Sequence, residues 1–344
     1  MKRLVKGPSF KWNLFLVILL VLEFVIFGVA NPKFLNINRI MMGANDFLSI
    51  CMISIFVTFV MITGGIDIQV YSIVGLTSII TGVLWQDFGF NIWNAVLLAI
   101  MVAALCGALS GFFIAYCRVQ AMVVTLGGGF LYSGVALLVS TLSSTESYKG
   151  ISGFPDSFKW ITQYKLFGVI PFQILIFLVM VIIASILLHK TKYGRKVFLV
   201  GVNQQAAEYA GINSRAIIMS TYILSAVSAA IAGVVLTSYL GTAKSDLGNG
   251  LTMNIITAVV LGGTLSTGGK GSIIGTALAA LAIGIMRFGM PLCFKVNTQY
   301  LDIPIGMLLV VVIVGRAVVS NPTVVSKFAK LKDSLTKKDK VQAE

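Results

Sequence analysis

The chain has 344 residues, of which 57% are apolar and only 11% are charged, and its mean hydropathy is +0.95. Ordinary soluble domains carry about 25% charged residues, so this composition excludes a typical soluble enzyme and indicates a membrane protein. The net charge of +14 does not indicate nucleic-acid binding, because the basic residues lie at the ends of apolar runs and not on one face with aromatic residues between them.

Ten apolar runs follow one another along the chain. Seven of them have at least about 17 residues, enough for a helix that crosses a bilayer: residues 14–30, 47–63, 92–116, 122–142, 171–188, 216–240 and 303–319. Three shorter runs complete the set: residues 72–85, 251–263 and 272–287. The sequence therefore predicts an all-α, polytopic membrane protein with about ten transmembrane helices in a single permease-like domain, with residues 12–320 as its membrane core.

Two of the apolar segments, residues 47–85 and 251–287, are too long for one span at about 1.5 Å per residue. The first is interrupted at Gly64-Gly65 and the second at Gly262-Gly263, which predicts two glycine-rich broken helices. Ser-Ile-Val-Gly follows the first pair at 72–75, and Ser-Ile-Ile-Gly follows the second at 272–275. This indicates a weak internal repeat with two extra residues in the second copy.

Paired interrupted helices often mark the solute site of a transporter. The alternative is that the glycine pairs only form tight turns between short helices.

The distribution of Lys and Arg predicts the orientation in the membrane. With ten spans, most of the basic residues fall on the side of the N-terminus, the 190–215 loop and the C-terminal tail. Basic residues are enriched on the cytoplasmic side of membrane proteins, so both termini and this loop are expected to be cytoplasmic. The basic tail, residues 321–344, is expected either to lie on anionic lipid or to be solvated.

Catalytic and metal-binding motifs are missing from the sequence. The 263–272 loop resembles a phosphate-binding loop, but Lys270 is followed by Gly271 where the Walker A pattern needs Ser or Thr. One histidine, His189, and four cysteines without metal-binding spacing do not make a metal site. We therefore expect no catalytic residue, no metal and no cofactor on this chain, and an intramembrane enzyme is disfavoured.

A polar stretch with the pattern G-x-N-x-x-A-A-x-x-x-G-I lies inside the basic 190–215 loop, from Gly201 to Ile212. It predicts a short amphipathic helix on the cytoplasmic surface, where a partner protein that supplies energy can dock. The residues predicted to make this coupling contact are Asn203, Ala206, Ala207, Glu208, Gly211 and Ile212.

A small set of polar side chains is available for a transport path. Uncharged groups of this kind can hydrogen-bond a neutral polyol, and they also connect helices to one another. Asp67 can instead accept the backbone donors that a broken helix exposes. If it titrates, it supports an alternative function as an ion-driven secondary transporter. The path candidates are Asn45, Asp67, Gln69, Thr125, Asn254 and Thr257.

Three motifs resemble those of a known family. Residues 64–72, GGIDIQVYS, are similar to the GGIDLSVGS signature of the permease subunits of ribose-type ATP-binding-cassette (ABC) importers. Residues 258–276 resemble the second signature of that family, and the 201–212 loop resembles its coupling helix. The resemblance covers essentially the whole chain. Gln69 and Tyr71 depart from it, because the family signature has Ser and Gly at these positions.

The resemblance implies an inner-membrane subunit that catalyses nothing itself and translocates a small sugar-like solute, such as ribose or another monosaccharide. ATP would be bound by a dimer of ATP-binding-cassette ATPases that dock on the coupling helix. A second permease subunit, which we expect to be non-identical, would complete the pore, and a periplasmic solute-binding protein would deliver the solute. Membrane lipid would surround the subunit. No nucleic acid is expected to bind it.

Overall fold

The computed structural model describes residues 8–320, so the predicted basic tail at 321–344 lies outside the described residues. The chain divides into two compact units, residues 1–296 and residues 297–344, and each is described by itself. The described part of the second unit holds the 3₁₀ helix η2 (Thr298–Tyr300) and the helix α13 (Asp302–Ser320).

The first unit is built almost entirely from helices. Its longer helices are α1 (Pro8–Ala30), α2 (Ile37–Ile62), α3 (Val70–Gln86), α4 (Ile92–Ala115), α5 (Ala121–Ser140), α7 (Phe172–His189), α10 (Ser214–Leu240), α11 (Leu251–Leu261) and α12 (Ile273–Phe294). Its shorter helices are η1 (Pro32–Leu35), α6 (Asp156–Gln163), α8 (Lys192–Val202) and α9 (Gln204–Tyr209).

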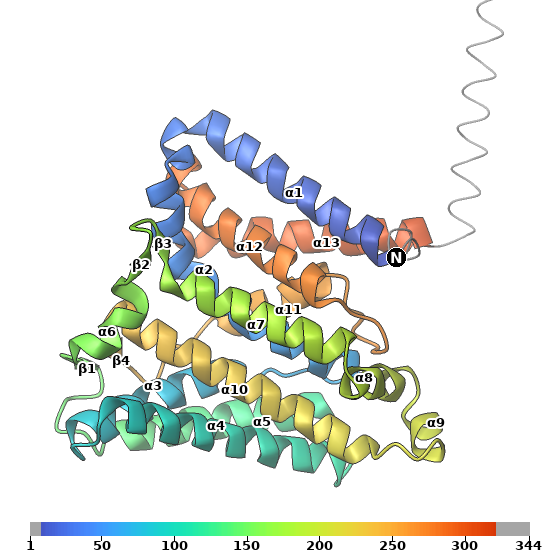
Figure 1. The fold of residues 1–344 in the computed structure, drawn as a ribbon, viewed down its shortest axis with the longest axis horizontal. Coiled ribbons are helices and arrows are strands. Elements are labelled where there is room, and N and C mark those ends of the chain that lie inside the picture. The colour runs from blue at the N-terminus through green and yellow to red at the C-terminus, as the bar shows by residue number, and fades with distance from the viewer. Residues whose placement is uncertain (1–7, 321–344) are drawn as a thin grey trace, which may run out of the picture. The chain divides into compact units, whose positions relative to one another are not determined.

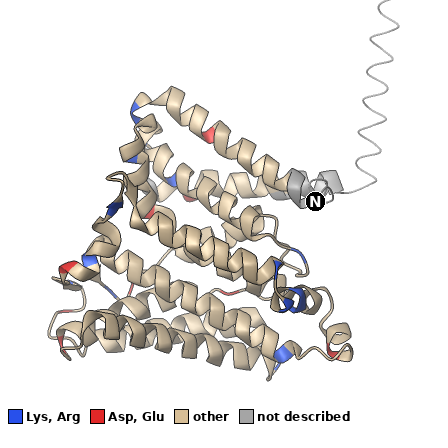
Figure 2. Cartoon of the chain, viewed as in Figure 1, with Lys and Arg blue, Asp and Glu red and all other residues tan. Residues whose placement is uncertain are grey.

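Seven helices within residues 8–320 are long and apolar enough to cross a membrane: α1, α2, α4, α5, α7, α10 and α12. Helices α3, α11 and part of α13 are apolar but shorter. Charged residues gather near the ends of the long helices and leave extended stretches without charge (Figure 2). The expectation of a mostly helical, multi-pass membrane protein is therefore confirmed.

Helix α2 forms the centre of the first unit. In its most apolar 18-residue stretch 89% of the residues are buried, against 17% in α1 and 22% in α5. It packs against α10, α12 and α11, and α10 also packs against α4 and α3. The outer helices expose many large apolar side chains. Exposed apolar surface of this extent is suited to lipid or to further membrane subunits.

Helix α2 begins at Ile37, although the apolar run predicted from the sequence begins only at residue 47. Polar residues such as Asn38 and Asp46 end the apolar run but not the helix. Asn36 precedes the helix, and its side-chain oxygen accepts hydrogen bonds from the backbone N–H groups of Asn38 and Arg39. This side-chain cap fixes the start of the helix.

The short elements lie at opposite ends of the long helices α7 and α10 (Figure 1). At one end are α6 and two antiparallel strand pairs, β1 (Ile151–Ser152) with β4 (Thr242–Ala243) and β2 (Lys165–Leu166) with β3 (Ile170–Pro171). The sequence did not predict these strands. At the other end are α8 and α9, where the sequence predicted the coupling loop.

The chain leaves helical geometry between α2 and α3 and again between α11 and α12; we call residues 63–69 the first interruption and residues 262–272 the second interruption. Gly64 and Gly263 both have left-handed backbones, with φ of +85° and +94°. At α2 the N–H groups of Gly64 and Gly65 donate to the carbonyls of Met61 and Val60, and α11 ends with the same pattern. Both helices thus end in a Schellman cap.

The caps show that the two interruptions align differently from the alignment predicted from their glycine pairs. Gly64 corresponds to Gly263 in backbone geometry, and not to Gly262 as the aligned glycine pairs suggest. The serines that follow also differ. The Ser272 side chain caps α12 by accepting from the N–H of Gly275, whereas Ser72 lies inside α3 and donates to the carbonyl of Gln69.

Candidate functional site

Helix α9 is a short surface helix at the end of the loop that the sequence singled out. Asn203 caps it, and its side-chain oxygen accepts a hydrogen bond of 2.9 Å from the N–H of Ala206. Ala207 is buried and anchors the helix, while Ala206 and Glu208 are exposed. A helix this short depends on its cap and anchor, since isolated helices of one or two turns are unstable.

Gly211 ends α9 with a left-handed backbone, φ +78°. Its N–H donates to the carbonyl of Glu208, and the N–H of Ile212 donates to the carbonyl of Ala207, which makes a third Schellman cap. A methyl group on Gly211 would have open space around it, so the glycine is required by the backbone conformation and not by crowding.

The first interruption carries a buried carboxylate. Asp67 is fully buried, and its Oδ2 accepts a hydrogen bond of 2.7 Å from the hydroxyl of Ser225 on α10. The carboxylate therefore ties the interruption to a neighbouring helix. In this conformation Asp67 is enclosed by protein, which favours the structural role considered for it over direct exposure to solute.

Gln69 occupies a second buried position, where its Oε1 accepts a hydrogen bond of 2.7 Å from Ser110 of α4. The Ser110 hydroxyl also lies 2.9 Å from the hydroxyl of Tyr132 on α5. Gly128 of α5 makes room for Gln69, because a methyl group there would overlap the Gln69 amide oxygen. The glutamine that departs from the family signature is thus matched by a glycine on the facing helix.

Tyr71 is accommodated in the same way. A methyl group on Gly129 would lie 3.2 Å from the Tyr71 ring, and one on Gly248 would overlap the Tyr71 carbonyl. Gly129 of α5 therefore leaves room for the added ring, and Gly248 lets the loop before α11 approach the Tyr71 backbone.

Backbone oxygens of the first interruption bond to side chains of two flanking helices. Thr125 of α5 donates to the carbonyl of Ile66 at 3.1 Å, and Thr252 of α11 donates to the carbonyl of Ile68 at 3.2 Å. The structure therefore brings three of the six path candidates together at this interruption: Asp67, Gln69 and Thr125.

The other three path candidates lie elsewhere. Asn254 of α11 accepts a hydrogen bond of 3.1 Å from Arg287 of α12 and donates to the carbonyl of Gly250. Asn45 of α2 and Thr257 of α11 are largely enclosed, and within residues 8–320 neither forms a hydrogen bond to another path candidate.

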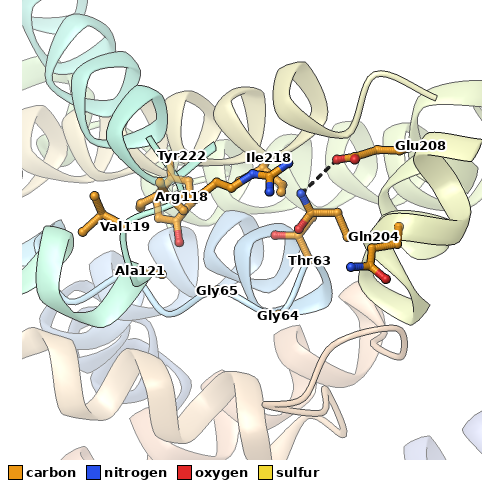
Figure 3. A pocket seen from close by; sticks show the side chains of 12 residues that line it. Thr63, Gly64, Gly65, Arg118, Val119, Ala121, Gln204, Glu208, Ile218 and Tyr222 are labelled. Atoms are coloured by element: carbon orange, nitrogen blue, oxygen red, sulfur yellow. Dashed lines mark hydrogen bonds between the residues drawn. The ribbon is translucent and has the colours of Figure 1, made fainter. Parts of the chain in front are cut away.

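A pocket of about 370 Å³ connects the first interruption with α9 (Figure 3). One wall is formed by Thr63, Gly64 and Gly65, and the opposite wall by Gln204, Gln205 and Glu208 of α9. The remaining lining residues come from the α4–α5 connection and from α10: Ile114, Arg118, Val119, Ala121, Ile218 and Tyr222. Most polar groups here are uncharged hydrogen-bonding groups, and Gln204 donates to Glu208 at 3.1 Å.

The sequence analysis missed Tyr222 and Ser225 of α10, which place a hydroxyl beside Gly65 and beside Asp67. The signal for them was Gly107-x-x-x-Gly111 on α4. A methyl group on Gly107 would lie 2.7 Å from the Tyr222 carbonyl, so these small residues let α10 approach closely. The described residues contain no group of three or more potential metal ligands.

A chain with several long apolar helices and a polar pocket has the features of a membrane transport protein. Residues 39–313 match the family described as "Branched-chain amino acid transport system / permease component". This chain belongs to that family. It is therefore a permease and not an enzyme, and the family implies an ATPase and a solute-binding protein as partners.

Curated relatives are similar over nearly the whole chain. Proteins named "Autoinducer 2 import system permease protein LsrD" from Photorhabdus laumondii, Enterobacter sp. strain 638 and Escherichia coli K12 are 39%, 41% and 40% identical to it. The alignments cover 91%, 89% and 89% of this chain and 93%, 93% and 92% of the relatives. No solved structure matches. These relatives support the resemblance to permease subunits of ABC importers and an inner-membrane location.

Proposed function

We propose that this chain is the membrane-spanning permease subunit of an ABC importer and translocates a small, neutral, sugar-like solute, with autoinducer 2 as the first candidate. The names of relatives about 40% identical to the chain support this solute. Ribose or another monosaccharide is the alternative solute within the same mechanism.

The observation that carries the proposal is the pocket shared by the first interruption and α9. Its volume of about 370 Å³ is in the range of small-molecule sites. Gln204, Gln205, Thr63 and the hydroxyl of Tyr222 are suited to exchange hydrogen bonds with a polyol. We interpret it as the cytoplasmic end of the transport path, with α9 forming both its wall and the docking element.

In this proposal the chain has ten spans, counted as the seven long apolar helices plus α3, α11 and α13, and both termini are cytoplasmic. Two ATPase subunits, which bind the ATP, dock against α9, and a second, non-identical permease completes the pore. The chain itself binds no cofactor. Its contribution is to populate two conformations to different extents when ATP is bound or hydrolysed.

The ion-driven alternative depends on Asp67, which would need to exchange a proton or cation during transport. Its carboxylate is fully buried and hydrogen-bonded to Ser225. This geometry favours the ATP-driven proposal.

The test is to purify the tagged chain from native membranes in detergent and to identify the proteins that accompany it by mass spectrometry. An ATPase together with a different permease is the expected result. An ATPase with only further copies of this chain would replace the second permease by a homodimer. The absence of any ATPase, under conditions that preserve known importers, would contradict the proposal.

A matched pair of variants tests whether α9 is the docking element. Ala206→Arg adds a bulky charge on the exposed face of α9 and should abolish ATPase copurification without loss of membrane insertion. Gly211→Asn keeps a residue type that tolerates the left-handed backbone, so it should preserve α9 and copurification. Equal copurification of both variants would show that the ATPase docks elsewhere.

A further inference from the structure

Three segments that are far apart in the sequence meet through their backbones at one point. They are the end of α2, the last turn of α8 and the second interruption. We call this point the glycine junction and define it by Ile62, Gly64, Gly201, Gly268 and Gly269.

A hydrogen bond joins the two interruptions at the junction. The N–H of Gly269 donates to the carbonyl of Ile62 at 2.8 Å. Carbonyls in the last turn of a helix have no partner inside the helix. The second interruption therefore satisfies an open carbonyl of α2, and the end of one broken helix is held by the loop of the other.

Helix α8 also packs closely against the glycine junction, through Gly201. A methyl group on Gly201 would overlap the Ile62 carbonyl and would lie 2.8 Å from the nitrogen of Gly269. A methyl group on Gly268 would lie 2.9 Å from the Gly201 carbonyl oxygen and 3.0 Å from the nitrogen of Gly64. The neighbours in these contacts are backbone atoms, which cannot move aside by changing a rotamer.

The junction lies directly beside the predicted docking helix. Helix α8 ends at Val202, and the next residue, Asn203, already caps α9. A displacement of α9 therefore reaches Gly201 through very few rotatable bonds. Because Gly201 contacts both interruptions, the same displacement acts on both of them.

We propose that the glycine junction is the mechanical link that makes the two interruptions move together when α9 is displaced, with Gly201 as the positioning residue. The inference rests on the proposed function, in which the ATPases act on α9. It adds the specific contact through which their action reaches the broken helices. Chains of packed backbone contacts are suited to such transmission, because they pass on a rigid displacement.

The test uses the complete complex, reconstituted in lipid vesicles with its ATPase, its partner permease and its binding protein. Gly201→Ala should leave ATPase copurification intact, because the exposed face of α9 is unchanged. Solute taken up per ATP hydrolysed should fall at least about tenfold, since the added methyl group separates α8 from the Ile62 carbonyl. The control is Gly134→Ala on α5, where a methyl group meets open space and which should retain the wild-type ratio.

A wild-type uptake ratio for Gly201→Ala would overturn the proposal. So would loss of ATPase copurification, because the junction would then shape the docking surface and not transmit its movement. A complex that contains no ATPase even with the wild-type chain would instead contradict the proposed function, so the two failures are distinguishable.

A measurement on the wild-type complex applies if Gly201→Ala does not fold. Amide hydrogen exchange is compared with and without a non-hydrolysable ATP analogue. Peptides covering residues 59–65, 195–204 and 263–272 should change protection together, while a peptide covering α6 should not change. A change in 195–204 without changes in the other two would overturn the proposal.

Discussion

The two interruptions end their preceding helices with the same cap but hold different chemistry between the caps. The first encloses polar side chains, with Asp67 bound to Ser225 and Gln69 bound to Ser110. The second is organised by its own backbone: the N–H of Leu265 donates to the carbonyl of Lys270, and the N–H of Gly268 donates to the carbonyl of Leu265. The shared cap and the different contents point to a division of roles.

The first interruption lines the pocket beside α9, so in the proposed function it is the interruption that meets the solute, while its buried polar side chains hold it to α4 and α10. The second interruption serves as a brace that holds the end of α2 and the start of α12. Ser266 and Thr267 are exposed, and the hydrogen bonds that shape this interruption join backbone groups. Substitutions should therefore act differently at the two sites, by removing side-chain partners at the first and by straining the backbone at the second.

The largest difference in stability between the two interruptions is expected when Asp67→Ala in the first is compared with a substitution in the second. Asp67→Ala leaves the Ser225 hydroxyl without its acceptor and opens a gap, so it should lower the free energy of unfolding by about 3 kcal/mol. Ser266→Ala in the second interruption should stay within about 0.5 kcal/mol of wild type. Both are measured by denaturant unfolding in mixed micelles.

Ser225→Ala supplies the control for Asp67. If the contact stabilises the protein, the double variant should lose less than the sum of the two single losses. Strictly additive losses would show that the two side chains do not stabilise one another, and the polar character of the first interruption would then have no structural role.

Local features of the chain could be predicted from the sequence, because they depend on neighbouring residues. The apolar runs indicated the positions of the helices, and the polar stretch from Gly201 to Ile212 indicated the short helix α9. The capping role of Asn203 was seen only in the structure. The glycine pairs gave the places where the helices end. Which glycine of each pair is left-handed could not be predicted, since either one can close a Schellman cap.

The long-range contacts of the site could not be predicted. Asp67 and Ser225 are 158 residues apart, and nothing near either one indicates the other. Path candidates were selected by polarity alone; the structure places Asp67, Gln69 and Thr125 at the first interruption, whereas the amide of Asn254 bonds to Arg287. Strands β1 and β4 escaped prediction because they pair across about 90 residues of sequence, and β2 and β3 because each has only two residues.

A smaller effect is expected for Gly128→Ala. Its methyl group would overlap the Gln69 amide oxygen and lie 3.3 Å from the Tyr132 ring, and overpacking of this kind costs about 2 kcal/mol. Gln69→Ser shortens the facing side chain and should restore most of the loss in the double variant. Thermal unfolding in detergent measures both. The control, Gly127→Ala, meets open space and should be neutral or slightly stabilising. Without recovery in the double variant, Gln69 and Gly128 are not a matched pair.

The smallest effect on stability is expected when the two capping glycines, Gly64 and Gly263, are each replaced by alanine. Gly64→Ala and Gly263→Ala each force alanine into a left-handed backbone, which costs about 1 kcal/mol. At Gly64 the nearest atom to the new methyl group is 3.7 Å away, whereas at Gly263 the Trp12 ring is 2.8 Å away. The Trp12 indole also donates to the carbonyl of Leu261 at 3.0 Å, so displacing the ring weakens the end of α11.

Gly263→Ala should therefore melt at a lower temperature than Gly64→Ala, and Gly64→Asn should melt close to wild type. Equal melting temperatures for the two alanine variants would mean that the Trp12 ring moves aside at no cost. The packing of Trp12 against Gly263 would then not stabilise the second interruption.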